Sequence, residues 1–537
     1  MTAPPATTGV GQRTEGVEPG PLRRALPYAG PAIVVFLGSL LLDLRTLMPG
    51  LGFWDTGEFQ TIGATLGIAH PTGYPSYTLL LWLTSVLLAP IGEPALRANL
   101  TSALLVSGAA ALTAVAVVQV TRRPVIGLAA GALLAVAPIA WENAVRADPH
   151  AFHLFLGALL LVLLLAWAGR ERAGHPDAGR WLVAAAVVFG ISLGNHALTL
   201  LMAPGVVLFV FSVVPRILWQ RWRLVLGCLV AVVATTLVIY AYLPIRSAMG
   251  PPLDYAHPAD WIRTDPQGRV TGGFRYLVLG EQFRGTFHEW PTIREAAEQV
   301  WAVIAHQLGY AAPLAVLGVL AGIVRRPRLM LLTIPWFVIP VWFLLGYENA
   351  DIERYYLVPI LVTVVWAALA VDAAWDIFVA GWRRLMPAEG VPPRWLSTTI
   401  TAVAGLALLV AAVAPVPERF GAADASDDTW AREWVDAFLP QLEPDPVVVS
   451  WWSYSTPLWY EHWARGQRPD MTIIDDRDVL DDGLGDLGDL ISGYLDEGRP
   501  VYLIRLDDDL PPFQDRFVLE EVPDLPGGSA WYVAGER

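Results

Sequence analysis

The sequence contains no lysine, so all 36 basic side chains are arginine. Its one cysteine, Cys228, lies within an apolar run, which excludes a disulfide framework and a cluster of thiolate metal ligands. Only 16% of the residues are charged, against about 25% in soluble domains. No Gly-rich loop follows a predicted strand, so a nucleotide-binding fold is not supported. A phosphate-binding cation in this protein must therefore be arginine, whose planar fork suits bidentate contacts.

Hydrophobic residues make up 55% of the chain, and the mean hydropathy is +0.47. Uninterrupted apolar runs of about 17 residues or more are long enough to cross a bilayer as helices. We therefore predict a mainly α, polytopic membrane protein with about eleven transmembrane helices. The predicted spans are Pro31–Leu47, Leu100–Val120, Pro124–Ala140, Phe152–Ala168, Trp181–Leu193, Ala197–Val214, Leu224–Leu243, Val300–Val324, Leu329–Leu345, Tyr356–Val379 and Leu396–Val413.

Arginine clusters flank the predicted spans and indicate their orientation, because loops rich in arginine stay in the cytoplasm. All six clusters fall on the cytoplasmic side if the shorter run Tyr77–Ala89 lies in the membrane interface and does not cross. The N-terminus is then cytoplasmic and the C-terminal segment extracytoplasmic, in a multi-pass protein of the plasma membrane. Residues 1–26 are rich in Pro, Gly and Thr and are expected to be disordered.

The C-terminal segment has a different composition from the rest. From Glu418 onward it holds 27 acidic residues and 9 arginines, although the whole chain has a net charge of −14. Short apolar runs alternate with helical patterns, which predicts a small, partly parallel α/β sheet. We expect three parts: the tail 1–26, a membrane domain 27–415 and an acidic, soluble domain 416–537. The acidity argues against a nucleic-acid partner.

The polar residues between Phe53 and Ser76 form the strongest candidate site. Asp55 and Glu58 share one face if this stretch is helical, and His70 and Tyr74 follow in a proline-rich turn. Carboxylates beside apolar spans are costly unless they are solvated or functional. Asp55 and Glu58 are therefore candidates for a general base or a metal ligand. An ordinary solvated loop is the alternative.

Other polar residues fall on the same predicted outer face. Asp148 lies between Arg146 and His150, and a surface pair of Arg146 with Asp148 is the simple interpretation. Asp55, Asp148 and His150 could instead bind a divalent metal, with Mg, Mn or Ca as the candidates. The remaining candidates are Asn195 and His196 as supporting residues, and Arg246 and Arg354 as ligands of a lipid-linked phosphate.

The motif WDTGEF at Trp54–Phe59, followed by AHPTGYP at Ala69–Pro75, resembles the family of transmembrane protein O-mannosyltransferases and its bacterial relatives. Further similar stretches are LGNHALTLLMAPG, YLPIRS and DIERYYLVP. The resemblance covers about residues 30–380 well and the acidic domain more loosely. It implies a GT-C-like fold, in which Asp55 is the acidic residue of the first outer loop, Glu58 is its partner and Asp148 is a second acidic site. It also implies outer-face arginines near the lipid phosphate.

The resemblance implies an inverting glycosyltransferase that moves a sugar, with mannose as one candidate, from a polyprenyl-phosphate donor to a hydroxyl of a protein or glycan acceptor. A transporter or flippase of a lipid-linked glycan is the first alternative, and a non-catalytic membrane scaffold is the second. A transporter needs polar groups along a path through the bilayer. The predicted spans are nearly free of charge except for Asp43 and Arg45 in the first span and Asp372 and Asp376 in the tenth.

Overall fold

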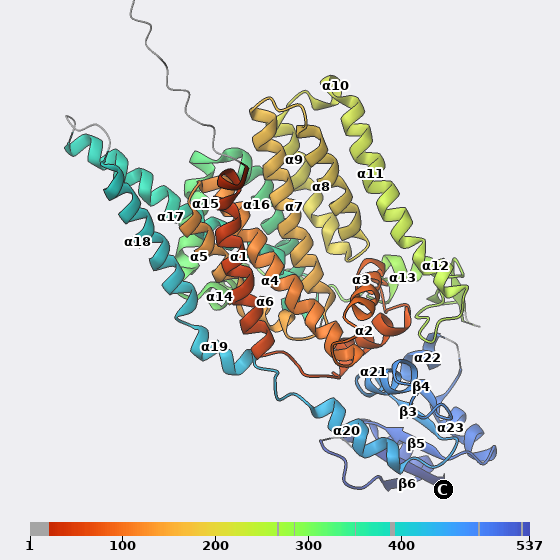
Figure 1. Ribbon diagram of the computed structural model, residues 1–537. Helices are drawn as coiled ribbons and strands as arrows, with labels where there is room; N and C mark the ends of the chain where they lie inside the picture. Colours follow the sequence, from red (N-terminus) through yellow and green to blue (C-terminus); the bar gives the residue numbers. More distant parts are fainter. Residues whose placement is uncertain are drawn as a thin grey trace, which may run out of the picture.

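The computed structural model describes residues 21–537 except 266–267, 284, 350, 387–391, 482–483 and 528–529. A bundle of long helices makes up most of the chain, and a smaller α/β domain lies beyond one end of it (Figure 1). Most of the predicted tail 1–26 lies outside the described residues; helix α1 begins at Pro21.

Each of the eleven predicted spans overlaps a helix of the described chain. Eight spans are long and apolar enough to cross a membrane, and a bent pair of helices makes a ninth. These helices are α1 (Pro21–Arg45), α4 (Pro94–Thr121), α7 (Pro149–Arg172), α11 (Trp222–Tyr240), α14 (Ile293–Leu308) with α15 (Ala312–Arg325), α16 (Pro327–Leu344), α17 (Leu357–Leu385) and α18 (Arg394–Val413) with α19 (Val416–Ala423). The bent pair is α5 (Pro124–Ala135) and α6 (Pro138–Ala144), at 68° to each other.

The two other predicted spans form shorter helices. Helix α8 (Ala178–Leu193) has 16 residues, and the 3-10 turn η1 (Ala197–Met202) continues into α9 (Ala203–Val213). The predicted interfacial run is α3 (Pro75–Leu87), with 13 residues, which is too short to span about 30 Å of hydrocarbon. The protein is therefore a multi-pass membrane protein with eight or nine full-length candidate spans in its described part, fewer than the eleven expected.

Proline sets several helix boundaries. Pro94, Pro124 and Pro149 stand at the first positions of α4, α5 and α7, where a missing N–H costs nothing. Pro138 similarly opens α6 and separates it from α5. The guanidinium of Arg419 donates to the carbonyl of Val136 at this break, at 2.7 Å. The polar group exposed by the bend thus has a partner inside the protein, as an apolar surrounding requires.

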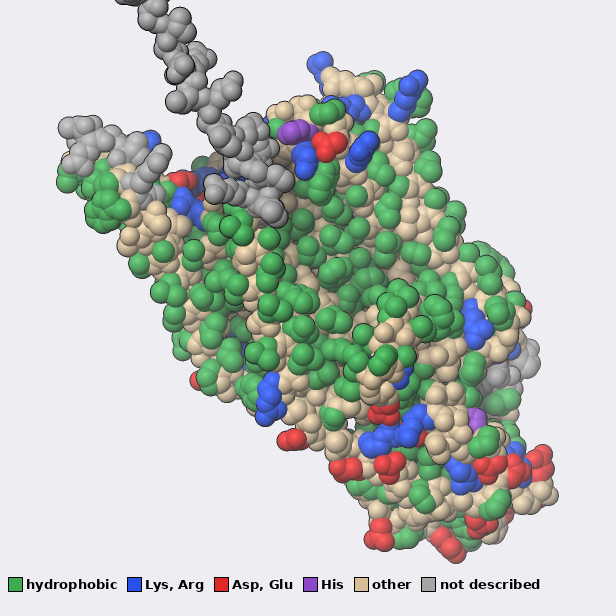
Figure 2. Space-filling model, viewed as in Figure 1, with side chains coloured by type: hydrophobic (Ala, Val, Ile, Leu, Met, Phe, Trp, Pro, Cys, Tyr) green, Lys and Arg blue, Asp and Glu red, His purple; other side chains and the backbone are tan. Residues whose placement is uncertain are grey.

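Helix α17 lies at the centre of the bundle and packs against α15, α16, α7 and α5. Gly318 of α15 allows a close approach, because a Cβ atom there would lie 1.7 Å from the carbonyl oxygen of Trp366. Helix α11 differs from α17, because none of its side chains is buried inside the protein. In Figure 2 hydrophobic side chains cover the middle of the molecule, and charged side chains gather at its two ends, as expected for a bilayer-embedded bundle.

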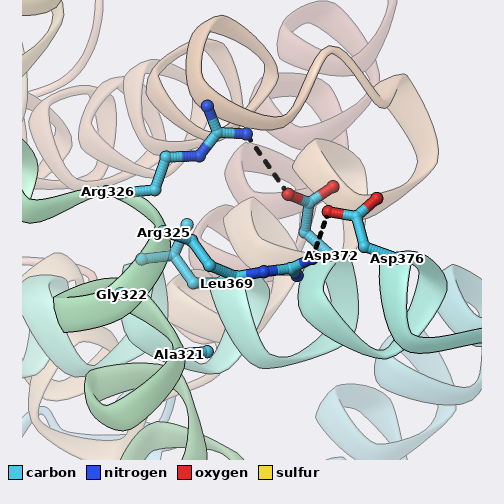
Figure 3. A pocket seen from close by; sticks show the side chains of 7 residues that line it. All are labelled: Ala321, Gly322, Arg325, Arg326, Leu369, Asp372 and Asp376. Carbon is cyan, nitrogen blue, oxygen red and sulfur yellow. Dashed lines mark hydrogen bonds and ion pairs between the residues drawn. The ribbon is translucent and has the colours of Figure 1, made fainter. Parts of the chain in front are cut away.

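The aspartates of the tenth predicted span belong to an ion-pair network with arginines from helix ends (Figure 3). Asp372 pairs with Arg326 at 3.5 Å, and Asp376 pairs with Arg325 at 2.6 Å. Asp372 also accepts from Arg123 at 2.8 Å. Arg325, Arg326, Asp372 and Asp376 line a cavity of about 250 Å³ beside Gly322. Because each carboxylate neutralises an arginine at or next to a helix end, the two aspartates tie helix ends together and do not mark a polar path through the bundle.

The C-terminal domain contains the predicted, partly parallel sheet. Its strand order is β4-β3-β5-β7-β6, with β3 parallel to both β4 and β5, and with β7 antiparallel to β5 and β6. The strands are β3 (Val447–Ser450), β4 (Thr472–Asp475), β5 (Val501–Ile504), β6 (Phe517–Glu521) and β7 (Ala530–Glu536). The helices are α20 (Trp430–Phe438), α21 (Trp452–Trp459) with the π-turn η6 (Tyr460–Ala464), α22 (Asp476–Asp481), α23 (Leu487–Asp496) and α24 (Pro511–Arg516).

The C-terminal domain packs directly on helix α2 (Trp54–Thr65) and on the start of α4 (Figure 1). Leu51 and Ala95 belong to the same apolar cluster as Trp434 of the domain. The hydroxyl of Tyr460 accepts from the backbone N–H of Ala95 at 3.1 Å, and Arg432 pairs with Glu93 at 2.9 Å. These contacts place the acidic domain over the stretch that carries the strongest candidate site.

Candidate functional site

Helix α2 places Asp55 and Glu58 one turn apart, as the sequence predicted. Asp55 lies in its first turn, where a carboxylate is favoured by the helix dipole. Gly57 between them permits close packing, because a Cβ atom there would lie 2.5 Å from the carbonyl oxygen of Gly52 and 2.8 Å from the hydroxyl oxygen of Thr456. Helix α2 is therefore packed tightly between the loop that precedes it and the C-terminal domain.

The guanidinium of Arg354 joins the two acidic loops. Its Nη1 lies 2.7 Å from Oδ2 of Asp148, and its Nη2 lies 3.3 Å from Oδ2 of Asp55. Asp351 also pairs with Nη2. The Asp148 side chain is 5% exposed, whereas that of Asp55 is 28% exposed. Asp55 is therefore the carboxylate of this pair that a substrate can reach.

The charges around Asp55 and Asp148 keep both carboxylates ionised. Burial alone would raise the pKa of Asp55, but the nearby His70 and Arg354 outweigh burial and lower that pKa below its ordinary value. Burial likewise opposes ionisation of Asp148, and Arg354 and His150 outweigh it and lower the pKa of Asp148 strongly. Opposite charges within hydrogen-bond distance are the general cause of such shifts.

Glu58 contacts a different partner from Asp55. One of its oxygens accepts the backbone N–H of His70 at 2.8 Å, and the other lies 2.5 Å from Nδ1 of the same residue. Burial lowers the pKa of His70, but Glu58 and Asp55 more than compensate and raise it above its usual value. The Glu58 side chain is 2% exposed. It therefore anchors the proline-rich turn and does not open to a substrate.

A cluster of imidazole and phenol rings lies beneath the two carboxylates. The ring of His150 stacks on that of Tyr355 with centroids 4.9 Å apart and lies equally close to the ring of His196. Tyr74 contacts both His70 and His196. Burial, together with the neighbouring His150 and His153, lowers the pKa of His196 well below its ordinary value. His196 is therefore neutral, and its Nδ1 accepts the backbone N–H of Leu198.

The C-terminal domain contributes two further side chains to the site. The indole N–H of Trp452 donates to Oδ1 of Asp55 at 3.1 Å. The guanidinium of Arg477 lies 3.9 Å from the centre of a Trp452 ring and donates to the hydroxyl of Tyr255 at 2.9 Å. Neither residue was predicted as part of the site, because about 400 residues separate Trp452 from Asp55. The only signal was the similarity of the C-terminal segment to the same family.

Seven of the predicted site residues lie together in the structure: Asp55, Glu58, His70, Tyr74, Asp148, His196 and Arg354. Asn195 is buried beside them and donates to the carbonyl of Pro149 at 3.0 Å. Arg146 is exposed, and the ion pairs of Asp148 go to Arg354 and His150, so the simple interpretation of an Arg146–Asp148 pair is wrong.

Arg246 lies at the opposite end of α2 from Asp55. Its guanidinium donates to the backbone carbonyls of Leu66 and Thr65, at 2.7 and 3.1 Å. These are carbonyls at the C-terminal end of the helix, which cations favour. Its role at a donor phosphate stays a prediction, as does that of Arg354.

Three potential metal ligands converge in the described part of the chain: Asp55, Glu58 and His70 each place a ligand atom within 4.8 Å of the others. The set predicted from the sequence is a different one: Asp55, Asp148 and His150. The guanidinium of Arg354 lies between Asp55 and Asp148 and pairs with both carboxylates. Two carboxylates and one imidazole fit a cation such as Mn²⁺ better than Mg²⁺ or Ca²⁺, which prefer oxygen ligands. Metal binding also requires neutral His70, whereas its present contacts favour the protonated ring. A resident metal stays a prediction.

Solved structures show the fold class of the protein. ArnT from Cupriavidus metallidurans, solved with undecaprenyl phosphate, superposes with a TM-score of 0.56 at 14% identity, covering 96% of this chain and 99% of that one. The archaeal oligosaccharyltransferase AglB from Archaeoglobus fulgidus, solved with an inhibitory peptide and a dolichol-phosphate, gives 0.52 at 13% identity over 96% and 75% of the two chains. The fold is that of GT-C membrane glycosyltransferases.

Within that class, the sequence resembles one particular family. A family model for the N-terminal domain of the protein O-mannosyl-transferase TMEM260 matches residues 55–217, beginning at Asp55 itself. The mouse (Mus musculus) protein O-mannosyl-transferase TMEM260 is 29% identical over 257 residues, which are 45% of this chain and 34% of the mouse protein. The match thus spans about a third of the mouse protein's length. The resemblance read from the WDTGEF and AHPTGYP motifs is confirmed.

Proposed function

We propose that this protein is an inverting glycosyltransferase that moves a sugar, with mannose the first candidate, from a polyprenyl-phosphate donor to an acceptor hydroxyl at the outer face of the membrane. The observation that carries the proposal is the position of Asp55. Its carboxylate is fixed by Arg354 on one oxygen and by Trp452 on the other, yet 28% of the side chain is open. A carboxylate that is oriented, ionised and accessible can accept the proton of a hydroxyl held against it.

In the proposed reaction the acceptor O–H donates its proton to Asp55 as its oxygen attacks C1 of the sugar. The bond between C1 and the phosphate oxygen breaks, and its electron pair leaves with the phosphate. The products are the glycoside with inverted C1 configuration, polyprenyl phosphate, and Asp55 carrying the proton. Orientation of the two reacting groups supplies much of the rate, because it replaces a bimolecular encounter. A divalent cation, if one resides at Asp55, Glu58 and His70, would add positive charge near the leaving phosphate.

Two features support a lipid-linked donor. ArnT was solved with undecaprenyl phosphate and AglB with a dolichol-phosphate, and this chain has the same fold. In addition, helix α2, which carries Asp55, lies at the end of the helix bundle next to the C-terminal domain (Figure 1), where a phosphate attached to a membrane-embedded prenyl chain would reside. The arginine distribution supports an extracytoplasmic position for this end, with the acidic domain in contact with the acceptor.

The experiment is transfer of radiolabelled sugar from a panel of polyprenyl-phosphate sugars, catalysed by purified full-length protein with its own membrane extract as the source of acceptor. We expect label to move from one donor to an acceptor of high molecular mass. If no label moves, release of free sugar by donor hydrolysis tests the same active site without an acceptor. Absence of both transfer and hydrolysis with every donor would contradict the proposal.

A further inference from the structure

The parallel strands of the C-terminal domain direct their carboxyl ends at the candidate site on helix α2. Strand β3 lies between β4 and β5 in the sheet. The chain therefore passes from β3 to β4 on one side of β3 and then to β5 on its other side. In open α/β sheets ligands bind outside the carboxyl ends of the strands at such a switch point. Here Trp452 follows the end of β3, and Arg477 follows the end of β4. Trp452 contacts Asp55, so this edge of the sheet faces the candidate active site.

Arg477 differs from Arg354 and Arg246 in the groups that contact its guanidinium. Arg354 pairs with three carboxylates, and Arg246 donates to two carbonyls. In the described part of the chain, Arg477 has no carboxylate within ion-pair distance; its guanidinium rests on the faces of Trp452 and Tyr255 and donates to the Tyr255 hydroxyl. One such hydrogen bond uses one of the five N–H donors of a guanidinium.

Arg477 also lies within electrostatic reach of Asp475 in its own domain and of Glu58 and His70 in the candidate site. A guanidinium held against aromatic rings has a fixed position, and its planar fork of N–H donors suits bidentate contact with a phosphate. Together these contacts place an arginine with spare donors against Trp452, whose indole N–H donates to Asp55.

We propose that Arg477 binds the phosphate of the polyprenyl-phosphate donor, so that the C-terminal domain completes the donor site. This inference rests on the proposed function, because it takes the donor class from it. It gives the acidic domain a role in the reaction itself: its arginine stabilises the negative charge that develops on the leaving phosphate.

The test measures binding of undecaprenyl phosphate without sugar to detergent-solubilised full-length protein. We expect Arg477→Gln to weaken binding about tenfold or more, since a charge-assisted, bidentate contact is lost. Arg477→Lys keeps the charge without the planar fork and should give an intermediate affinity. Arg516→Gln is the matched control, because Arg516 pairs with Asp489 on the surface of the same domain, and it should bind like the wild type.

The outcomes separate the two proposals. Equal affinity of folded Arg477→Gln and wild type overturns the role of Arg477, and Arg477→Met replaces the glutamine variant if that one does not fold. Failure of the wild type to bind any polyprenyl phosphate contradicts the proposed function instead. Inorganic phosphate is run as a separate ligand: if it binds the wild type as tightly as undecaprenyl phosphate, the site takes a free anion and the lipid-linked donor is overturned as its ligand.

Discussion

The two carboxylates of α2 have different roles because different side chains contact them. Asp55 is bound by an arginine and an indole, whereas Glu58 is bound twice by His70. The sequence placed both on one helix face and assigned them similar chemistry. Their partners come from other parts of the chain, so the difference between an open base and a buried anchor could not be predicted from spacing alone.

Replacing Arg354 should change the pH dependence of the reaction. The base must be unprotonated, and Arg354 helps to lower the pKa of Asp55. Arg354→Gln removes this attraction, so the pKa of Asp55 rises and activity is lost at a higher pH as the medium is acidified. Arg354→Lys should keep the acid limb near that of the wild type. The measurement is the pH profile of kcat/KM, and an unchanged acid limb in an active Arg354→Gln protein would contradict the assignment.

Glu58→Gln should destabilise the turn that carries His70 by about 1–3 kcal/mol, the usual cost of losing a buried, charge-assisted partner. The pKa of His70 is raised in the folded protein, so this stabilisation is fully present below the ordinary histidine pKa and is lost as the pH rises through the raised value. The difference in Tm between wild type and variant should be largest near pH 6 and narrow at alkaline pH. A difference that grows with pH would refute this account.

At the scale of elements, apolar run length predicted the helices well. Each of the eleven predicted segments is helical, and the run Tyr77–Ala89 corresponds to the short helix α3. Eight or nine of the eleven predicted segments are full-length candidate spans in the described chain, because α8 and the η1–α9 segment are short and α5 is sharply bent against α6. The hairpin of β6 and β7 was not predicted, since its charged residues interrupt the alternation typical of strands.

Gly318 should be essential for packing of α15 on α17. A methyl group at this position would overlap the carbonyl oxygen of Trp366, and backbone cannot move aside as a side chain can. Gly318→Ala should therefore lower the Tm in detergent by the equivalent of about 1–3 kcal/mol, as overpacked substitutions do. Gly227→Ala in α11 is the control, because the space around Gly227 is open. Equal Tm values for the two variants would show that the helices separate easily.

At the scale of the whole molecule, the C-terminal domain closes over the site that the membrane domain presents. Composition indicated a separate acidic domain, and the strand pattern indicated its sheet, but neither indicated where it docks. Docking depends on contacts between residues hundreds of positions apart, such as Tyr460 with Ala95 and Trp452 with Asp55. Such pairs leave no periodicity in a single sequence, which is why Trp452 and Arg477 were missed.

Trp452→Phe tests whether this docking matters to catalysis. The substitution keeps an aromatic ring beneath Arg477 but removes the N–H that orients Asp55. We expect kcat to fall about tenfold, from loss of one hydrogen bond of about 1–1.5 kcal/mol, with the acid limb shifted to higher pH. Trp531→Phe, on strand β7 away from Asp55, is the control and should retain full activity. A Trp452→Phe protein with wild-type kcat and pH profile would show that the domain merely covers the site.

The central claim is that Asp55 removes the acceptor proton, and Asp55→Asn tests it most directly. The measurement is sugar transfer from the active polyprenyl-phosphate donor by wild type and variant, each checked for an unchanged Tm and for undecaprenyl-phosphate binding. We predict that the variant folds and binds the lipid but transfers at least a thousandfold more slowly, about 4 kcal/mol in the barrier. Transfer at the wild-type rate by a folded Asp55→Asn protein would contradict the account.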